Sequence, residues 1–122
     1  MVALLVALAV CSAVPPALAH AQLLASNPAV GSSTKAFPKL ITLTFDDDLV
    51  DLPGGNQIVV VDPKKKPVQQ GETVLEGSRI SVKLRPSKRY GKYSVTYRVI
   101  SADGHPVTAQ FPFYFVRKSA KN

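Results

Sequence analysis

Apolar and polar residues alternate one by one along several short stretches of this chain. Residues 41–45 read ITLTF and 80–84 read ISVKL, and the same alternation runs through 93–99 and 107–115. Side chains on a β-strand point alternately to its two faces, whereas an amphipathic helix repeats every 3.6 residues. The pattern therefore predicts half-buried β-strands and no helix.

Turn-forming residues separate these stretches at close intervals. Residues 57–61 read QIVVV, a continuous apolar run between Gly54-Gly55-Asn56 and Asp62-Pro63, which indicates an interior strand. With a first strand near 22–25 and a short one near 73–75, we expect about seven strands. This number is typical of an all-β domain, a single immunoglobulin-like Greek-key β-sandwich.

The first 19 residues differ from the rest of the chain. Met1 to Ala19 are apolar, contain no charged side chain and end in Ala-Leu-Ala. This is the small-x-small ending that a signal peptidase accepts, and the apolar core is short for a membrane span. We expect a signal peptide at 1–19, cleavage after Ala19, and a single domain at 20–122 in the periplasm or the extracellular cell envelope. The alternative is an uncleaved anchor.

The chain is strongly basic. The chain carries 15 Lys and Arg against 8 Asp and Glu, a formal net charge of +7, all beyond Ala19. Such a charge favours nucleic acid or anionic envelope surfaces. Because an exported protein meets little nucleic acid and the basic residues are scattered along the sequence, we interpret them as a solubilising surface and expect no nucleic-acid partner. The only sulfur-containing residues, Met1 and Cys11, lie within 1–19.

The chain has two histidines, and cleavage after Ala19 would make one of them, His20, the first residue of the mature protein. An N-terminal histidine offers an α-amine and an imidazole, which together can chelate a metal ion. The ordinary pKa values of these groups, about 8 and about 6.5, allow both to lose their protons near neutral pH. Copper(II) prefers such nitrogen ligands.

The second histidine, His105, lies in the sequence SADGHP at 101–106, two residues after Asp103. Asp103 and His105 could both face one site if the backbone between them is extended. The sandwich could also bring its first strand beside this turn. Together the two histidines indicate a candidate metal site with Asp103, whereas alone each has an ordinary explanation: DG is a common turn, and cleavage must leave some residue first.

Three segments are similar to the CopC copper-resistance proteins: HAQLLASNPAVGSS from His20, LTFDDDLV, and YSVTYRVISADGHPVTAQFPFYFV. The resemblance covers nearly all of 20–122. It implies that His20, Asp103 and His105 are the copper(II) ligands. It also places Ser26, Pro28 and Gly31 in the turn after the first strand.

The resemblance has two further consequences and one departure. Some members of the family place a carboxylate near the copper after the L-x-F strand, which corresponds to Asp47. Members with a copper(I) site carry a Met-rich loop, and the lack of methionine in 20–122 resembles the copper(II)-only branch. Tyr97 stands where the family usually has Trp.

We therefore expect a non-enzymatic, monomeric carrier or buffer of copper(II) in copper homeostasis or resistance. The resemblance implies an integral-membrane copper transporter of the CopD type as its partner. One alternative is a small oxidative enzyme, because an N-terminal histidine with a second histidine also resembles the copper site of polysaccharide monooxygenases. Another is a metal-free immunoglobulin-like structural domain.

Overall fold

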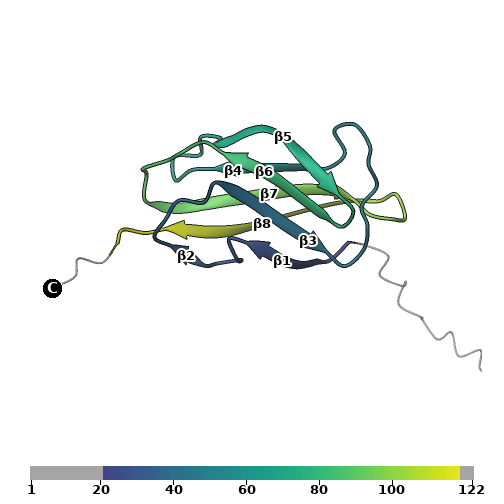
Figure 1. Cartoon of the computed structure of the whole chain (residues 1–122), viewed down its shortest axis with the longest axis horizontal. Coiled ribbons are helices and arrows are strands. Elements are labelled where there is room, and N and C mark those ends of the chain that lie inside the picture. Colours follow the sequence, from purple (N-terminus) through teal and green to yellow (C-terminus); the bar gives the residue numbers. More distant parts are fainter. Residues whose placement is uncertain (1–20, 119–122) are drawn as a thin grey trace, which may run out of the picture.

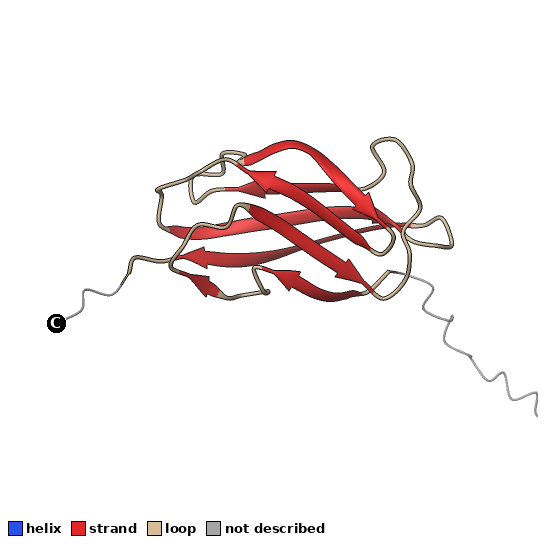
Figure 2. Ribbon diagram, viewed as in Figure 1, coloured by secondary structure: helices blue, strands red, loops and turns tan. Residues whose placement is uncertain are grey.

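The computed structural model describes residues 21–118, and all regular structure in this range is β-strand (Figures 1 and 2). Eight strands form two four-stranded sheets. The first sheet has the order β1 (Leu23–Asn27), β3 (Leu40–Phe45), β6 (Arg79–Leu84) and β5 (Gln69–Glu76). The second has the order β2 (Ser33–Thr34), β8 (Pro106–Phe115), β7 (Gly91–Ile100) and β4 (Gln57–Val61). The predicted Greek-key sandwich is confirmed.

The core lies between the two sheets and is built by the alternation seen in the sequence. In β3, Ile41, Leu43 and Phe45 are buried, while the residues between them are half-buried. The Phe45 ring meets the Tyr97 ring of the opposite sheet edge to face, with centroids 5.4 Å apart. Aromatic pairs of this geometry add to the free energy gained by burying the rings. Tyr97 thus fills a core position at the end of the sandwich where β3 ends.

The prediction of an interior strand at 57–61 was wrong, because β4 is an edge strand that pairs only with β7. Its central residue, Val59, is 38% exposed. Side chains of β5 cover the open edge: the amide of Val60 donates to Gln69 Oε1 at 2.9 Å, and that of Ile58 to Thr73 Oγ1 at 3.0 Å. An apolar run does not distinguish a central strand from an edge strand protected by side chains of a neighbouring sheet.

The turn after β1 leads into β2, a two-residue strand that the sequence did not predict. Gly31 has a φ of +72°, which glycine adopts without the steric cost that other residues meet. Its amide donates to Pro112 O at 2.7 Å, and β2 then runs parallel to the end of β8. A strand of two residues is too short to show a period, so the described chain has eight strands where about seven were expected.

One end of the sandwich, which we call the hairpin end, holds the β7–β8 turn at 101–105 and the start of β1 (Figure 1). The connection from β3 to β4 is bonded there to both sheets. The amide of Leu49 donates to Gly77 O at 3.0 Å, and the amide of Val50 to Ile100 O at 2.9 Å. Between residues 21 and 118, no helix is long and apolar enough to cross a membrane.

Candidate metal centre

The β7–β8 turn is a tight connection held by its own backbone. The strands pair as far as Ile100 opposite Pro106. The amide of Ser101 then donates to His105 O at 2.9 Å, and the amide of Gly104 to Ser101 O at 2.8 Å. Gly104 has a φ of +87°, a conformation that most residues adopt only with strain. The DG sequence therefore closes a hairpin that leaves the side chains before and after the glycine beside each other.

Asp103 and His105 are brought together at the tip of this hairpin. Asp103 Oδ2 lies 2.8 Å from His105 Nδ1, and the backbone amide of His105 donates to Asp103 Oδ1 at 3.3 Å. The imidazole is 65% exposed and the carboxylate 28% exposed. The two side chains lie together, but a turn with Gly104 at a φ of +87° brings them there, and not the extended backbone expected from the sequence. An oxygen and a nitrogen, both suited to a divalent ion, converge on a site that solvent reaches.

Asp103 is held as a carboxylate. The Ser101 hydroxyl donates to Asp103 Oδ1, and this bond, followed by the hydrogen bond with His105, keeps the pKa of Asp103 well below its ordinary value. Partial burial opposes the shift and is outweighed. The negative charge is therefore present without a proton having to be displaced. This contribution to fold stability is complete above pH 3.8 and is lost as the pH falls through the lower folded pKa.

Sequence reasoning missed two residues that position this turn. Ser101 is 1% exposed, and its hydroxyl contacts both Asp103 and His105 O, the latter at 3.0 Å. Asn56 Oδ1 accepts a hydrogen bond from the Ile100 amide at 3.0 Å, and Asn56 Nδ2 donates one to Val50 O at 2.8 Å. The position of a serine two residues before Asp103 could have indicated its role from the sequence. Asn56 lies 44 residues from its partner Ile100, so no local pattern indicates its role.

The start of the described chain is fixed at the same end of the sandwich. Ala21 is buried in the core. Gln22 and Asp46 are joined twice: the Gln22 amide donates to Asp46 Oδ1 and the Asp46 amide to Gln22 O, each at 2.9 Å. Leu23 pairs with Phe45, whose ring packs on Tyr97 of β7. The chain thus enters β1 at the hairpin end.

His20 and the segment 1–19 lie outside the described residues, so the assignment of His20 and the cleavage after Ala19 stay predictions. Between residues 21 and 118, no group of three or more His, Cys, Asp or Glu side chains is placed to hold a metal ion.

Asp47 does not complete such a group, although its segment lies at the hairpin end. Its Oδ1 accepts the amide of Asp48 at 2.8 Å and its side chain is exposed. The neighbouring Asp46 is the residue that anchors the start of β1. The three adjacent aspartates thus have different surroundings, which the sequence alone does not separate.

The structure is a small β-sandwich that carries an aspartate and a histidine side by side at one hairpin tip. Residues 23–116 match the model of the CopC domain family. The chain belongs to this family, which is a family of copper-resistance proteins and not of enzymes.

Known proteins agree with this assignment. The chain is 29% identical over 104 residues to Protein YobA of Escherichia coli K12, covering 81% of each chain. It is 28% identical over 98 residues to the copper transport protein CutJ of Bacillus subtilis, covering 78% of this chain but 18% of CutJ. This chain therefore corresponds to only a small part of CutJ.

Solved structures have the same fold. CopC from Methylosinus trichosporium OB3b superposes with a TM-score of 0.71 at 24% identity, covering 84% of this chain and all of that one. PcoC, a methionine-rich copper resistance protein from Escherichia coli, gives a TM-score of 0.61 at 25% identity, covering 80% and 99% of the two chains. Unlike that methionine-rich relative, this chain has no methionine after Met1.

Proposed function

We propose that this protein is an exported carrier or buffer that binds one copper(II) ion through His20, Asp103 and His105. The observation that carries the proposal is the 2.8 Å separation of Asp103 Oδ2 and His105 Nδ1 on a hairpin fixed by its backbone. Two adjacent ligand atoms of a tetragonal ion, each about 2 Å from it, are about 2.8 Å apart. The same two atoms that share a proton in the free protein therefore suit one metal ion.

His20 would supply the remaining donors. It directly precedes Ala21, and the chain at Ala21 and Gln22 is fixed at the hairpin end. An α-amine and an imidazole from this residue, with the Asp103 carboxylate and the His105 imidazole, form a set of three nitrogens and one oxygen. Such a set suits copper(II), whereas copper(I) favours the thiolates and thioethers that 20–122 lack.

The charge around the hairpin tip supports capture of a cation. Asp46, Asp47 and Asp48 follow β3 at the hairpin end, and Asp51 lies in the same connection. Carboxylates gathered on one surface raise the local concentration of cations and the rate at which they associate. These side chains would increase the rate of copper capture without being ligands.

The exposure of the site favours transfer of the ion over catalysis. The His105 side chain is 65% exposed at the tip of a hairpin, where a partner protein can reach it. A membrane copper transporter of the CopD type could approach the ion there without the sandwich opening. The protein would then act in the periplasm or the extracellular envelope as a copper carrier in copper homeostasis or resistance.

Acid is expected to release the ion. Protons compete with copper for one amine and two imidazoles, whereas the lowered pKa of Asp103 keeps its carboxylate available. Because a protonated amine or imidazole cannot bind the ion, the affinity should fall by roughly ten- to a hundredfold from pH 7 to pH 6. Competition titrations with a copper chelator, corrected for protonation of the chelator, measure this. An affinity that does not change over this range would contradict a site with three nitrogen ligands.

Replacing Ser101 with Ala is expected to weaken copper binding about tenfold, the usual effect of losing a partner that orients a metal ligand. The substitution removes the hydroxyl that contacts Asp103 and His105 O. The pKa of Asp103, followed by nuclear magnetic resonance, should rise toward its ordinary value. Ser94→Ala, in the adjoining strand β7, serves as the control and should change neither quantity. An unchanged Asp103 pKa in Ser101→Ala would exclude this positioning role.

A further inference from the structure

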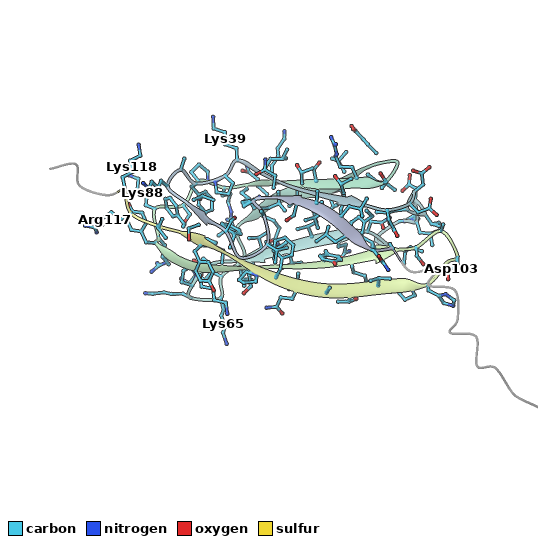
Figure 3. All side chains as sticks on the ribbon, turned by 90° about the horizontal axis from the view of Figure 1, so that it is seen from below. Lys39, Lys65, Lys88, Asp103, Arg117 and Lys118 are labelled. Carbon is cyan, nitrogen blue, oxygen red and sulfur yellow. The ribbon has the colours of Figure 1, made fainter. Side chains whose placement is uncertain are left out.

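Most of the basic residues, which are scattered along the sequence, are gathered in the fold. They lie at the end of the sandwich opposite the hairpin end, which we call the basic end. It is formed by the β2–β3, β4–β5 and β6–β7 connections, the start of β7 and the residues after β8 (Figures 1 and 3). Its cations are Lys35, Lys39, Lys64, Lys65, Lys66, Arg85, Lys88, Arg89, Lys92, Arg117 and Lys118.

Backbone hydrogen bonds tie these connections into one surface. The amide of Leu84 donates to Lys39 O at 3.0 Å, and that of Arg85 to Val68 O at 2.9 Å. The Arg117 guanidinium lies over the Tyr90 ring, 5.5 Å from its centroid. The basic end is therefore a fixed feature of the fold.

The acidic residues have the opposite distribution. Six of the carboxylates lie at or next to the hairpin end: Asp46, Asp47, Asp48, Asp51, Glu76 and Asp103. Figure 3 shows Asp103 at one extremity of the molecule, with Lys88, Arg117 and Lys118 toward the other. The molecule therefore carries a strong charge dipole along its long axis.

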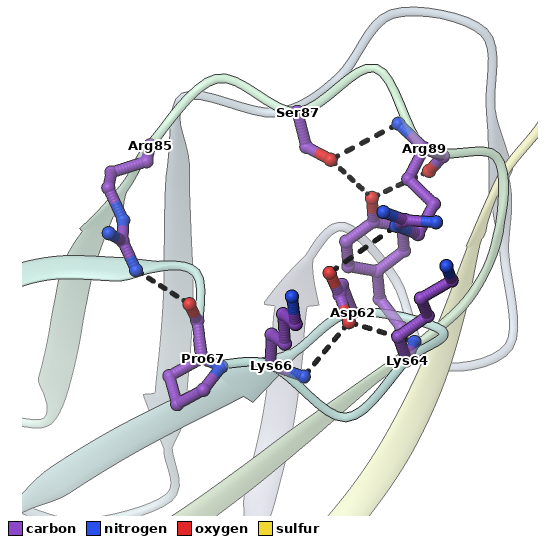
Figure 4. A network of polar contacts seen from close by, with 8 residues as sticks. Asp62, Lys64, Lys66, Pro67, Arg85, Ser87 and Arg89 are labelled. Atoms are coloured by element: carbon purple, nitrogen blue, oxygen red, sulfur yellow. Dashed lines mark hydrogen bonds and ion pairs between the residues drawn. The ribbon is translucent and has the colours of Figure 1, made fainter.

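The single acidic residue of the basic end, Asp62, has its negative charge compensated by neighbouring backbone amides and an arginine (Figure 4). Its carboxylate accepts the amides of Lys64 and Lys66 at 2.8 and 2.9 Å and lies 3.6 Å from Arg89 Nε. The residue is only 8% exposed. It holds the β4–β5 turn in shape and presents little negative charge to a partner.

The basic end also exposes an aromatic side chain. Tyr90 is 47% exposed, and its ring packs on Phe115 with centroids 4.8 Å apart. It lies between Arg89 and the start of β7, with Arg117 against its face. A partly exposed tyrosine with a supported ring, flanked by cations, suits the boundary between water and lipid headgroups.

We propose that the basic end docks on an anionic phospholipid bilayer, with the hairpin end directed away from the surface. Cations from several separate connections, most of them on flexible lysine side chains, match a continuous negative surface that demands no single geometry. Each Lys or Arg near such a surface contributes about 1 kcal/mol, within the range of the Debye length. An acidic protein partner would instead require defined ion pairs. The proposal does not depend on copper binding, and the docked protein would have to leave the surface before a membrane transporter could take the ion from the hairpin tip.

The test is sedimentation of the exported chain, with its first residue verified, together with lipid vesicles. At low salt the protein should bind vesicles of phosphatidylcholine mixed with phosphatidylglycerol, should not bind phosphatidylcholine alone, and should be released at high salt. The double variant Lys64→Gln, Lys88→Gln should bind anionic vesicles at least tenfold more weakly. The matched variant Arg79→Gln, Arg98→Gln loses the same charge away from the basic end and should change binding by less than about threefold.

Three results would overturn the proposal. These are equal loss of binding in both double variants, equal binding to neutral vesicles, and no binding to anionic vesicles at low salt, which would favour an acidic protein partner.

The orientation of the protein on the bilayer is tested separately. A fluorophore attached at Lys88→Cys should be quenched by lipids that carry a quencher, whereas one at Asp51→Cys should not, and quenching of both equally would contradict the proposed orientation.

Discussion

Adding one glycine before His20 of the exported protein is expected to weaken copper(II) binding about a thousandfold. The extension turns the α-amine of His20 into a peptide nitrogen, so the chelate formed by amine and imidazole is lost. Structural zinc sites with four ligands bind with about 10–16 kcal/mol, or about 2.5–4 kcal/mol for each ligand. Losing the amine and the chelate ring together should therefore reduce the copper affinity by at least the contribution of one ligand. Competition with a chromophoric copper chelator measures the change.

The control for this variant is a glycine added after Asn122, which leaves the first residue unaltered. Both proteins should show the same thermal unfolding, because β1 begins at Leu23 and Ala21 is the first described core residue. Wild-type affinity in the N-terminally extended protein would show that the α-amine is not a ligand. In that case Asp103 and His105 would need a different third donor.

Replacing His105 with Ala is expected to weaken copper(II) binding by several hundredfold, because one nitrogen ligand is removed. The hairpin should persist, since the bond from the Ser101 amide to His105 O uses backbone atoms only.

Asp103→Asn gives a second measurement at the same tip and should also weaken binding. Asp51→Asn is its matched control, because it removes one charge from the same end without altering the β7–β8 turn.

If Asp103→Asn and Asp51→Asn weakened binding equally, the effect would be one of general charge, and Asp103 would not be a ligand. If His105→Ala kept wild-type affinity, the hairpin tip would have no part in the site. Circular dichroism of each variant shows whether the sandwich is intact. A loss of affinity in a folded His105→Ala protein would support ligation.

The strands could be predicted from the sequence where alternation was long enough to assign a face. β3, β6 and β7 each bury every second residue for most of their length, and β8 does so over its second half, as the apolar pattern indicates. β2 has two residues and depends on the bond from Gly31 to Pro112, which links parts of the chain far apart in sequence. The run at 57–61 was misassigned because hydrophobicity does not report whether a strand has a neighbour on each side.

The candidate site was predictable to the extent that it is local. Asp103 and His105 are two residues apart, so a turn suffices to bring them together. Asn56 and Val50, which hold the end of β7, act through long-range contacts. The charge dipole was missed for a similar reason: period 2 indicates which face a residue occupies, and the order of the strands decides at which end of the sandwich each connection lies.

The most direct test of the central claim is pulsed electron paramagnetic resonance of the copper(II)-loaded exported protein, after mass spectrometry of its first residue. We expect one copper per chain, a first residue of His20, and coupling to two imidazole rings, one of which disappears in His105→Ala. A spectrum with no imidazole coupling, or one that His105→Ala leaves unchanged, would contradict a copper site at the hairpin tip.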